Sequence, residues 1–251
     1  KVTLGAGNTP SCTFTNTKDA TLTIAKDAVP DDAQDFAYTT SGSGPGGFTG
    51  GFSEDDDADP TLPNTRTFSF DGTQLGVKYV KEGAVAGWTL TNISATAGGA
   101  TVVIGHLNTP GDWNSFDPGA GNGYDQGDDT VKVTLGAGNT PSCTFTNTKL
   151  ATIILVKNAK GGNDTFNFNA TGNGLPATIP ITTTGTPNGT GSQTFSNLLP
   201  TSIGGGIRSV SEVAPGGGWT FTGVGYSATG ASSVSLDQVL MKATVTNLVA
   251  G

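Results

Sequence analysis

Hydrophobic and polar residues alternate along most of this chain, in short stretches separated by turns rich in Gly, Pro and Asn. Alternation with a period of two sends successive side chains to opposite faces of a β-strand, whereas an amphipathic helix needs apolar residues three and four positions apart. No window sustains the helical spacing, because Gly or Pro interrupts nearly every candidate. The pattern therefore predicts an all-β protein made of β-sandwiches.

One stretch of the chain occurs twice without a difference. The segment KVTLGAGNTPSCTFTNTK stands at residues 1–18 and again at residues 132–149, and an identical stretch of this length indicates an internal repeat. In each copy, two alternating stretches flank the turn sequence GAGNTP, which predicts a β-hairpin. Each copy is followed by another alternating stretch that ends in a lysine, ATLTIAK at Lys26 and ATIILVK at Lys157.

The repeat divides the chain into two domains whose parts follow the same order. We expect the first domain at residues 18–148, with a long loop at 105–129, and a second, shorter domain at residues 149–251. The hairpin at residues 1–17 has no lysine-bearing strand before it. Two explanations are open: the chain was cut from a longer array of repeats, or this hairpin completes a neighbouring subunit by strand addition.

Composition and charge narrow the possible functions. The 251 residues include 39 glycines and 13 prolines, only 13% are charged, and the net charge is −8. An acidic surface does not attract nucleic acid or an anionic membrane, and no apolar run approaches the ~20 residues that a membrane span needs. Low charge with abundant Thr, Gly and Asn is typical of an extracellular protein. We therefore expect a cell-surface location, with identical subunits or adjacent repeats as partners.

Three residue types recur in the same order in both domains. Each domain has a lysine at the end of its first strand, a glutamate shortly before a Gly-Trp pair, and an asparagine at the end of its last strand. These residues are Lys26, Glu82 and Asn147 in the first domain, and Lys157, Glu212 and Asn247 in the second. A lysine or an asparagine at a strand end is ordinarily a surface residue, but an ordered trio that occurs twice indicates a shared site.

In these segments the chain resembles the collagen-adhesin B-type domains, the prealbumin-like (SpaA-like) repeats of bacterial surface proteins and pilins. The resemblance is carried by LTIAK and IILVK, by VKEGAVAGW and VSEVAPGGGW, and by TFTNTK and TVTNL. It implies tandem prealbumin-like (immunoglobulin-like) β-sandwiches. It also implies an autocatalytic isopeptide bond in each domain, Lys26 to Asn147 assisted by Glu82, and Lys157 to Asn247 assisted by Glu212.

The chemistry of these residue types agrees with that implication. Lysine attacks a carbonyl only as the free amine, and burial lowers its pKa toward that form. A carboxyl group in the same pocket has a raised pKa, so it can polarise the Asn carbonyl and move protons while ammonia leaves. We therefore expect a structural segment of an extracellular stalk, pilus or filament. From the resemblance we expect it to cross-link itself once, rather than to act as an enzyme that turns over a substrate.

Two further signals give alternative interpretations. An adhesin or carbohydrate-binding module would use loop 105–129 with Trp113 and Tyr124, because an aromatic side chain on a long loop must pack or bind. The acidic run that begins at Glu54 is typical of a solvated loop. Within it, Asp55, Asp57 and Asp59 are weak candidates for Ca²⁺ ligands, and no other cofactor is expected.

Overall fold

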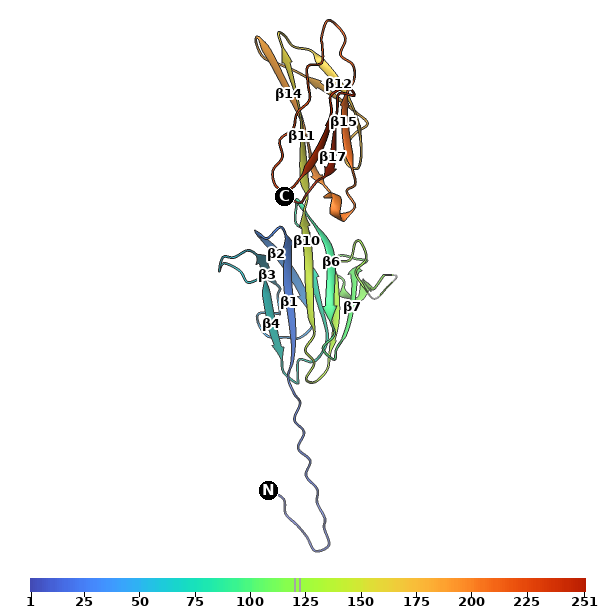
Figure 1. Ribbon diagram of the computed structural model, residues 1–251. Helices are drawn as coiled ribbons and strands as arrows, with labels where there is room; N and C mark the ends of the chain where they lie inside the picture. The colour runs from blue at the N-terminus through green and yellow to red at the C-terminus, as the bar shows by residue number, and fades with distance from the viewer. Residues whose placement is uncertain (120, 122) are drawn as a thin grey trace.

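The structure is a computed structural model that describes residues 1–119, 121 and 123–251 (Figure 1). Within those residues the chain forms 17 β-strands and two short 3₁₀-helices, with no α-helix. This confirms the predicted all-β class. In the same part of the chain, no helix is long and apolar enough to cross a membrane. The strands form two units, one within residues 20–149 and one within residues 151–247, which lie end to end.

The first unit is a two-layered sandwich. Its elements are β1 (Ala20–Val29), β2 (Asp32–Ser41), β3 (Phe52–Asp56), β4 (Thr65–Phe70), β5 (Gly76–Glu82), β6 (Trp88–Thr96), β7 (Thr101–Leu107), η1 (Trp113–Ser115), β8 (Phe116–Asp117), β9 (Thr130–Leu135) and β10 (Ser142–Lys149). One sheet has the order β4-β1-β10-β6 and the other β3-β2-β5-β9-β7-β8. The first strand of the unit, β1, and its last, β10, are parallel neighbours.

The second unit is also built from two sheets. Its elements are β11 (Ala151–Lys160), β12 (Thr165–Thr171), β13 (Thr178–Thr182), β14 (Asn188–Leu198), η2 (Thr201–Ile203), β15 (Arg208–Glu212), β16 (Ser233–Asp237) and β17 (Lys242–Asn247). The larger sheet has the order β13-β12-β15-β17-β16, and the smaller contains only β11 and β14. The first unit buries one large apolar cluster, whereas the second buries two small ones.

The structure corrects the predicted β-hairpin in both copies of the repeated segment. At residues 132–149 the two strands, β9 and β10, belong to different sheets, so the turn between them carries the chain from one layer to the other. At residues 1–18 no strand forms and every residue is exposed, and the segment extends away from the first unit (Figure 1). Alternation predicts a strand, but it does not say which sheet the strand joins.

Candidate functional site

The first strand of the first unit carries its lysine into the core. Leu22 and Ile24 of β1 are fully buried, Thr23 between them is only half-buried, and Lys26 follows in the same inward row. Because side chains alternate between the two faces of a strand, the register that buries Leu22 and Ile24 also places the Lys26 amine inside the sandwich.

The last strand of the unit brings the asparagine to this amine. β10 runs parallel to β1, with Phe145 opposite Lys26 and Asn147 opposite Ala28. Phe145 and Asn147 both face the core. Lys26 Nζ donates hydrogen bonds of 2.9 Å to Asn147 Oδ1 and 2.9 Å to the Phe145 backbone oxygen. The predicted partners Lys26 and Asn147 are therefore in direct contact.

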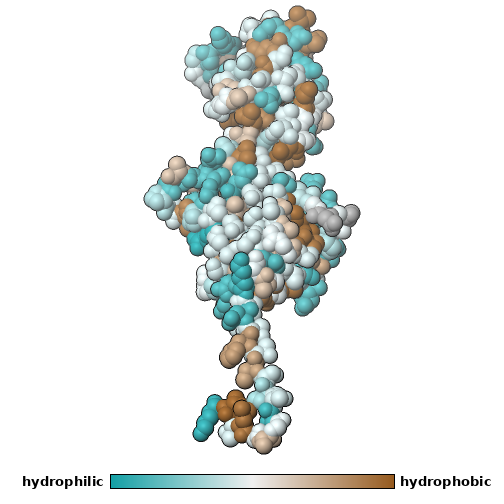
Figure 2. All heavy atoms as spheres, turned by 60° about the horizontal axis from the view of Figure 1, so that its bottom comes forward, coloured by the Kyte–Doolittle hydropathy of each residue, from teal (hydrophilic) through white to brown (hydrophobic). Residues whose placement is uncertain are grey.

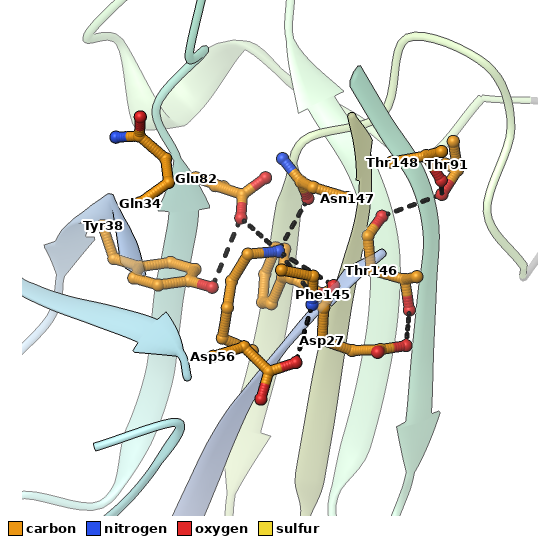
Figure 3. A network of polar contacts seen from close by, with 12 residues as sticks. Asp27, Gln34, Tyr38, Asp56, Glu82, Thr91, Phe145, Thr146, Asn147 and Thr148 are labelled. Atoms are coloured by element: carbon orange, nitrogen blue, oxygen red, sulfur yellow. Dashed lines mark hydrogen bonds and ion pairs between the residues drawn. The ribbon is translucent and has the colours of Figure 1, made fainter. Parts of the chain in front are cut away.

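The facing sheet supplies the carboxyl group. Glu82, the last residue of β5, has its Oε1 3.3 Å from Lys26 Nζ. Tyr38 lies directly across the ladder from Glu82 on β2 and donates a hydrogen bond of 3.3 Å to the same oxygen. Figure 3 shows Glu82, Tyr38 and Asn147 converging from three strands on one point between the sheets. The site thus joins an amine, an amide and a carboxyl group that are far apart in the sequence.

Aromatic side chains close the site against water. Lys26 Nζ lies 4.1 Å from the centre of the Phe36 ring, and the edge of Trp88 packs against Phe36 at 5.3 Å. Trp88 is the tryptophan of the Gly-Trp pair. The Lys26 side chain is 0% exposed and that of Glu82 3%, so neither charge is screened by solvent.

Burial shifts both ionisable groups of the site toward their neutral forms. It lowers the pKa of Lys26, an effect that the nearby Glu82 charge partly opposes. It also raises the pKa of Glu82, against the opposing effects of the Lys26 charge and of hydrogen bonds from Asn147, Lys26 and Tyr38. Both shifts have the same cause, the loss of hydration of a charged group in an apolar site. A nucleophilic amine next to a proton-donating carboxyl group is the combination that amide exchange needs.

The second unit reproduces only part of this arrangement. Lys157 Nζ lies 2.7 Å from Glu212 Oε1 and 4.2 Å from the centre of the Phe166 ring, and Trp219 packs edge-on against Phe166. Asn247 is not part of the group. It ends β17, which pairs with β15 and β16 rather than with β11, and its Nδ2 donates to the Ala231 backbone oxygen at 3.2 Å. The structure therefore does not bring the expected pair of Lys157 and Asn247 together.

The burial of another carboxyl group, that of Glu54, was missed by the sequence analysis, which placed this residue in a solvated loop. Glu54 lies on β3, is fully buried, and neither of its carboxyl oxygens has a hydrogen-bond partner in the described structure. Burial raises the pKa of Glu54 to about 9, although the charges of Arg66 and Lys26 oppose the shift. No local signal distinguishes Glu54 from the acidic residues that follow it.

Three aspartates after Glu54 lie close together. Asp55, Asp57 and Asp59 each offer a carboxylate oxygen within 4.8 Å of the others. Asp55 is buried, whereas Asp59 is exposed. Thr61 donates hydrogen bonds to Asp59 at 2.6 Å and to Asp55 at 3.3 Å. Calcium binding by this cluster stays a prediction.

Trp113 and Tyr124, the two residues of loop 105–129 considered for ligand binding, both contact the body of the first unit. Trp113 packs on Tyr79, with ring centres 5.4 Å apart. Tyr124 packs against the core cluster and donates a hydrogen bond of 2.6 Å to the Leu90 backbone oxygen. Both side chains are half-buried. Ligand binding through this loop stays a prediction.

No protein-family model and no curated protein matches the chain. Among solved structures, it has a distant similarity to the major pilin of Streptococcus pyogenes, with 14% identity, coverage of 79% of this chain and 83% of the pilin, and a TM-score of 0.18. One mutant of the same pilin matches with 15% identity over 79% of this chain and 83% of the mutant, at a TM-score of 0.23. Another matches with 14% identity over 78% and 82%, at a TM-score of 0.19.

Proposed function

We propose that this chain is a structural segment of an extracellular stalk, pilus or filament on a cell surface. We further propose that an isopeptide bond between Lys26 and Asn147, made by the protein itself, locks its first unit. The observation that carries the proposal is the buried contact of Lys26 Nζ with Asn147 Oδ1 at 2.9 Å and with Glu82 Oε1 at 3.3 Å. A surface lysine or asparagine has no need of such a site, and burying an unreacted ion pair is costly.

The reaction exchanges one amide for another. The neutral Lys26 amine attacks Asn147 Cγ, while protonated Glu82 hydrogen-bonds to Oδ1 and stabilises the charge that develops there. The Cγ–Nδ2 bond then breaks. Nδ2 leaves as ammonia with its own two protons and one proton that the lysine amine releases through Glu82, which ends in its starting state. A cavity of about 320 Å³ lined in part by Glu82, Trp88 and Asn147 gives the ammonia room to leave.

The position of the bond explains its use in a load-bearing protein. The chain enters the first unit through β1 and leaves it through β10, and Leu150 alone separates β10 from β11. A tension applied to the ends of the unit therefore acts on β1 and β10. A covalent bond between Lys26 and Asn147 joins these two strands directly, so the segment between them carries no load.

The bond also restricts the unfolded chain. Lys26 and Asn147 are 121 positions apart. By analogy with a disulfide that closes a loop of this size, the cross-link contributes about 5 kcal/mol to stability. The reaction occurs once in each molecule, so the protein consumes no substrate.

Intact-protein mass spectrometry tests the proposal. The purified chain should weigh one ammonia less than its sequence mass for the first unit, and fragmentation should recover a branched peptide that joins Lys26 to Asn147. The substitutions Lys26→Ala, Asn147→Ala and Glu82→Ala should each restore the full mass of that region. An unmodified Lys26 and Asn147 in a correctly folded chain would rule the cross-link out.

A further inference from the structure

The end of β3 and the loop that joins it to β4 bring three acidic side chains together. Asp55, Asp57 and Asp59 each offer a carboxylate oxygen, and these oxygens lie within 4.8 Å of one another. Figure 1 shows the loop projecting from one side of the first unit, and hydrophilic residues gather on the same side in Figure 2. Three like charges at this spacing repel one another, so a positive charge between them would stabilise the arrangement.

Asp55 lies at the buried end of the cluster. Successive side chains of a strand point to opposite faces, so Asp55 points outward from β3 whereas Glu54 points toward Lys26 in the core. Asp55 is nevertheless only 1% exposed. The loop folds back over it, and Thr61 donates a hydrogen bond of 3.3 Å to Asp55 Oδ2. The other oxygen, Oδ1, is buried and has no hydrogen-bond partner among the described residues. A buried carboxylate oxygen without a partner is costly, and this one indicates a ligand from outside the chain.

The neighbouring aspartates also have oxygens to offer. Asp57 Oδ1 accepts a hydrogen bond of 2.8 Å from the Asp59 backbone N, and Asp59 Oδ1 accepts bonds of 2.7 Å and 2.6 Å from the backbone N and the hydroxyl of Thr61. In the described part of the chain, the Oδ2 atoms of Asp57 and Asp59 accept no hydrogen bond, and no Lys or Arg forms an ion pair with any of the three aspartates. Each aspartate can therefore give an oxygen to a cation.

The type and spacing of these ligands suit calcium. Ca²⁺ takes about 6–8 oxygen ligands at roughly 2.3–2.6 Å, so two ligands on opposite sides of one ion are about 4.6–5.2 Å apart. The three carboxylate oxygens, all within 4.8 Å of one another, can therefore reach a single ion. Mg²⁺ requires shorter distances and is usually held by one or two carboxylates. Asp59 is exposed, so an ion can enter from solvent and water can complete its coordination.

The loop is hydrogen-bonded at both ends to the strand that carries Lys26. Asp56 Oδ2 accepts a bond of 2.9 Å from the backbone N of Ala28, and the Asn64 backbone oxygen accepts one of 2.8 Å from the backbone N of Lys26. Asn64 Nδ2 also donates to Asp56 Oδ1 at 3.1 Å. The loop carries the chain from β3 in the larger sheet to β4 in the smaller one. An ion bound here would therefore fix the crossing between the two sheets beside Lys26.

We propose that Asp55, Asp57 and Asp59 bind one Ca²⁺ ion, which fixes the loop between β3 and β4 and so stabilises the folded first unit. The inference goes beyond the proposed function, because the site uses neither Lys26 nor Asn147. Calcium sites of extracellular modules have dissociation constants of about 10⁻⁴–10⁻³ M. A site with three protein carboxylates and one open side should bind in this range.

Isothermal titration calorimetry with CaCl₂ tests the site, on the full chain from which metal has been removed with EDTA. We expect one ion to bind per chain. Asp55→Asn, Asp57→Asn and Asp59→Asn each remove one negative charge, so each should weaken binding by about tenfold or more. Asparagine keeps an oxygen that can accept the hydrogen bonds of the loop. Since Asp57 and Asp59 are not buried, their variants should fold even if Asp55→Asn does not.

Asp71 offers a matched control. Its Oδ1 accepts hydrogen bonds of 2.8 Å and 2.6 Å from the backbone N and the hydroxyl of Thr73, as Asp59 Oδ1 does from Thr61. Within the described residues, however, Asp71 belongs to no cluster of three acidic groups. Asp71→Asn should therefore bind Ca²⁺ as the parent chain does. Titration of the parent chain with MgCl₂ should give binding about tenfold weaker or more.

The effect on folding gives a second measurement. Ca²⁺ at ten times its dissociation constant should shift the equilibrium about tenfold toward the folded state. Chemical denaturation with CaCl₂ and with EDTA measures this shift in the parent chain, and Asp59→Asn should lose it. Asn147→Ala should abolish the ammonia loss and still bind Ca²⁺, whereas Asp59→Asn should do the reverse. The failure of one proposal is thus distinguishable from the failure of the other.

Four results would overturn the proposal. They are no binding of CaCl₂ by the parent chain, unchanged affinity in Asp57→Asn and Asp59→Asn, a loss of affinity in Asp71→Asn as large as theirs, and equal affinities for Ca²⁺ and Mg²⁺.

Discussion

Lys26 and Asn147 are 121 positions apart in the sequence, and their side chains form a buried hydrogen bond of 2.9 Å between the two sheets of the first unit. The contact exists because the first and last strands of the unit are parallel neighbours. A parallel pair cannot be joined by a tight turn, so all the intervening strands must be placed before the two residues meet. The proposed bond therefore requires the two strands to pair first, which happens only in a folded unit.

Replacing Lys26 should destabilise the first unit by removing the cross-link. We expect Lys26→Met to retain the ammonia and to lower the free energy of unfolding by about 5 kcal/mol, as estimated from loop closure. Chemical denaturation followed by tryptophan fluorescence measures this change. Asn147→Ala, which keeps the pair of Lys26 and Glu82, should show a similar loss. If Asn147→Ala were as stable as the parent chain, the stabilisation would come from the ion pair instead.

Substitutions of Glu82 and of Tyr38 should slow the formation of the isopeptide bond to different extents. Glu82→Gln removes the group that moves protons, so the rate of bond formation should fall by about 10²–10⁴-fold. Tyr38→Phe removes only the hydroxyl that hydrogen-bonds to Glu82 at 3.3 Å, and this variant should still react, more slowly than the parent chain. The loss of ammonia after refolding, followed by mass spectrometry, gives both rates. Equal rates for Glu82→Gln and the parent chain would contradict the role given to Glu82.

Glu54 should make the first unit less stable as the pH rises. Its pKa is raised from 4.5 to about 9 in the folded protein. Between these values the folded state holds a proton that the unfolded state has lost, so the free energy of unfolding falls with increasing pH. The slope should approach 1.4 kcal/mol per pH unit at most, about the value of one proton. Glu54→Gln should lose this slope across the window and be more stable than the parent chain near pH 9. Parallel stability curves for the two proteins would contradict the prediction.

The two cysteines should differ in reactivity toward an alkylating reagent. Cys143 is buried, and burial raises the pKa of its thiol to about 12, so it should not react in the folded chain. Cys12 is exposed and should react in the monomer. Equal labelling of Cys12 and Cys143 in the folded chain would contradict the burial of the Cys143 thiol.

The length to which the chain extends under force should show directly whether Lys26 and Asn147 are joined. With Lys26 joined to Asn147, the segment between them should not extend when the chain is pulled from its ends. Asn147→Ala should release it and lengthen the unfolded chain by about 400 Å, at ~3.5 Å per residue over that segment. Single-molecule force spectroscopy resolves a difference of this size. An equal extension for the two proteins would show that the strands are not joined.

The sequence grouped Lys26, Glu82 and Asn147 from local signals, and the structure brings these three side chains into contact. The alternation in β1 that buries Leu22 and Ile24 also directs Lys26 inward, and the same rule directs Asn147 inward from β10. The same local reasoning failed for Asn247. Its Thr-x-Thr-Asn context resembles that of Asn147. The order of strands along the chain does not say which sheet a strand enters, however, and β17 joins the sheet of β15 rather than that of β11.

Glu54 marks another limit of sequence reasoning. Nothing in the run of acidic residues distinguishes it, and its burial follows from the way β3 pairs with β2 at the edge of the larger sheet. The contact between Lys157 and Glu212 agrees with the sequence analysis, which grouped these two residues because the same trio occurs in the first unit.

The sequence by itself determined that the chain folds into β-strands, that one segment is present twice, and that a lysine, a glutamate and an asparagine recur in the same order. These features depend on residue identity and on a period of two, which can be read along a single stretch of chain. Only the tertiary structure decided which strands lie side by side, and hence that Lys26 meets Asn147 while Lys157 does not meet Asn247. Pairing between distant strands depends on the register and layer of the whole sheet, a property that no single stretch contains.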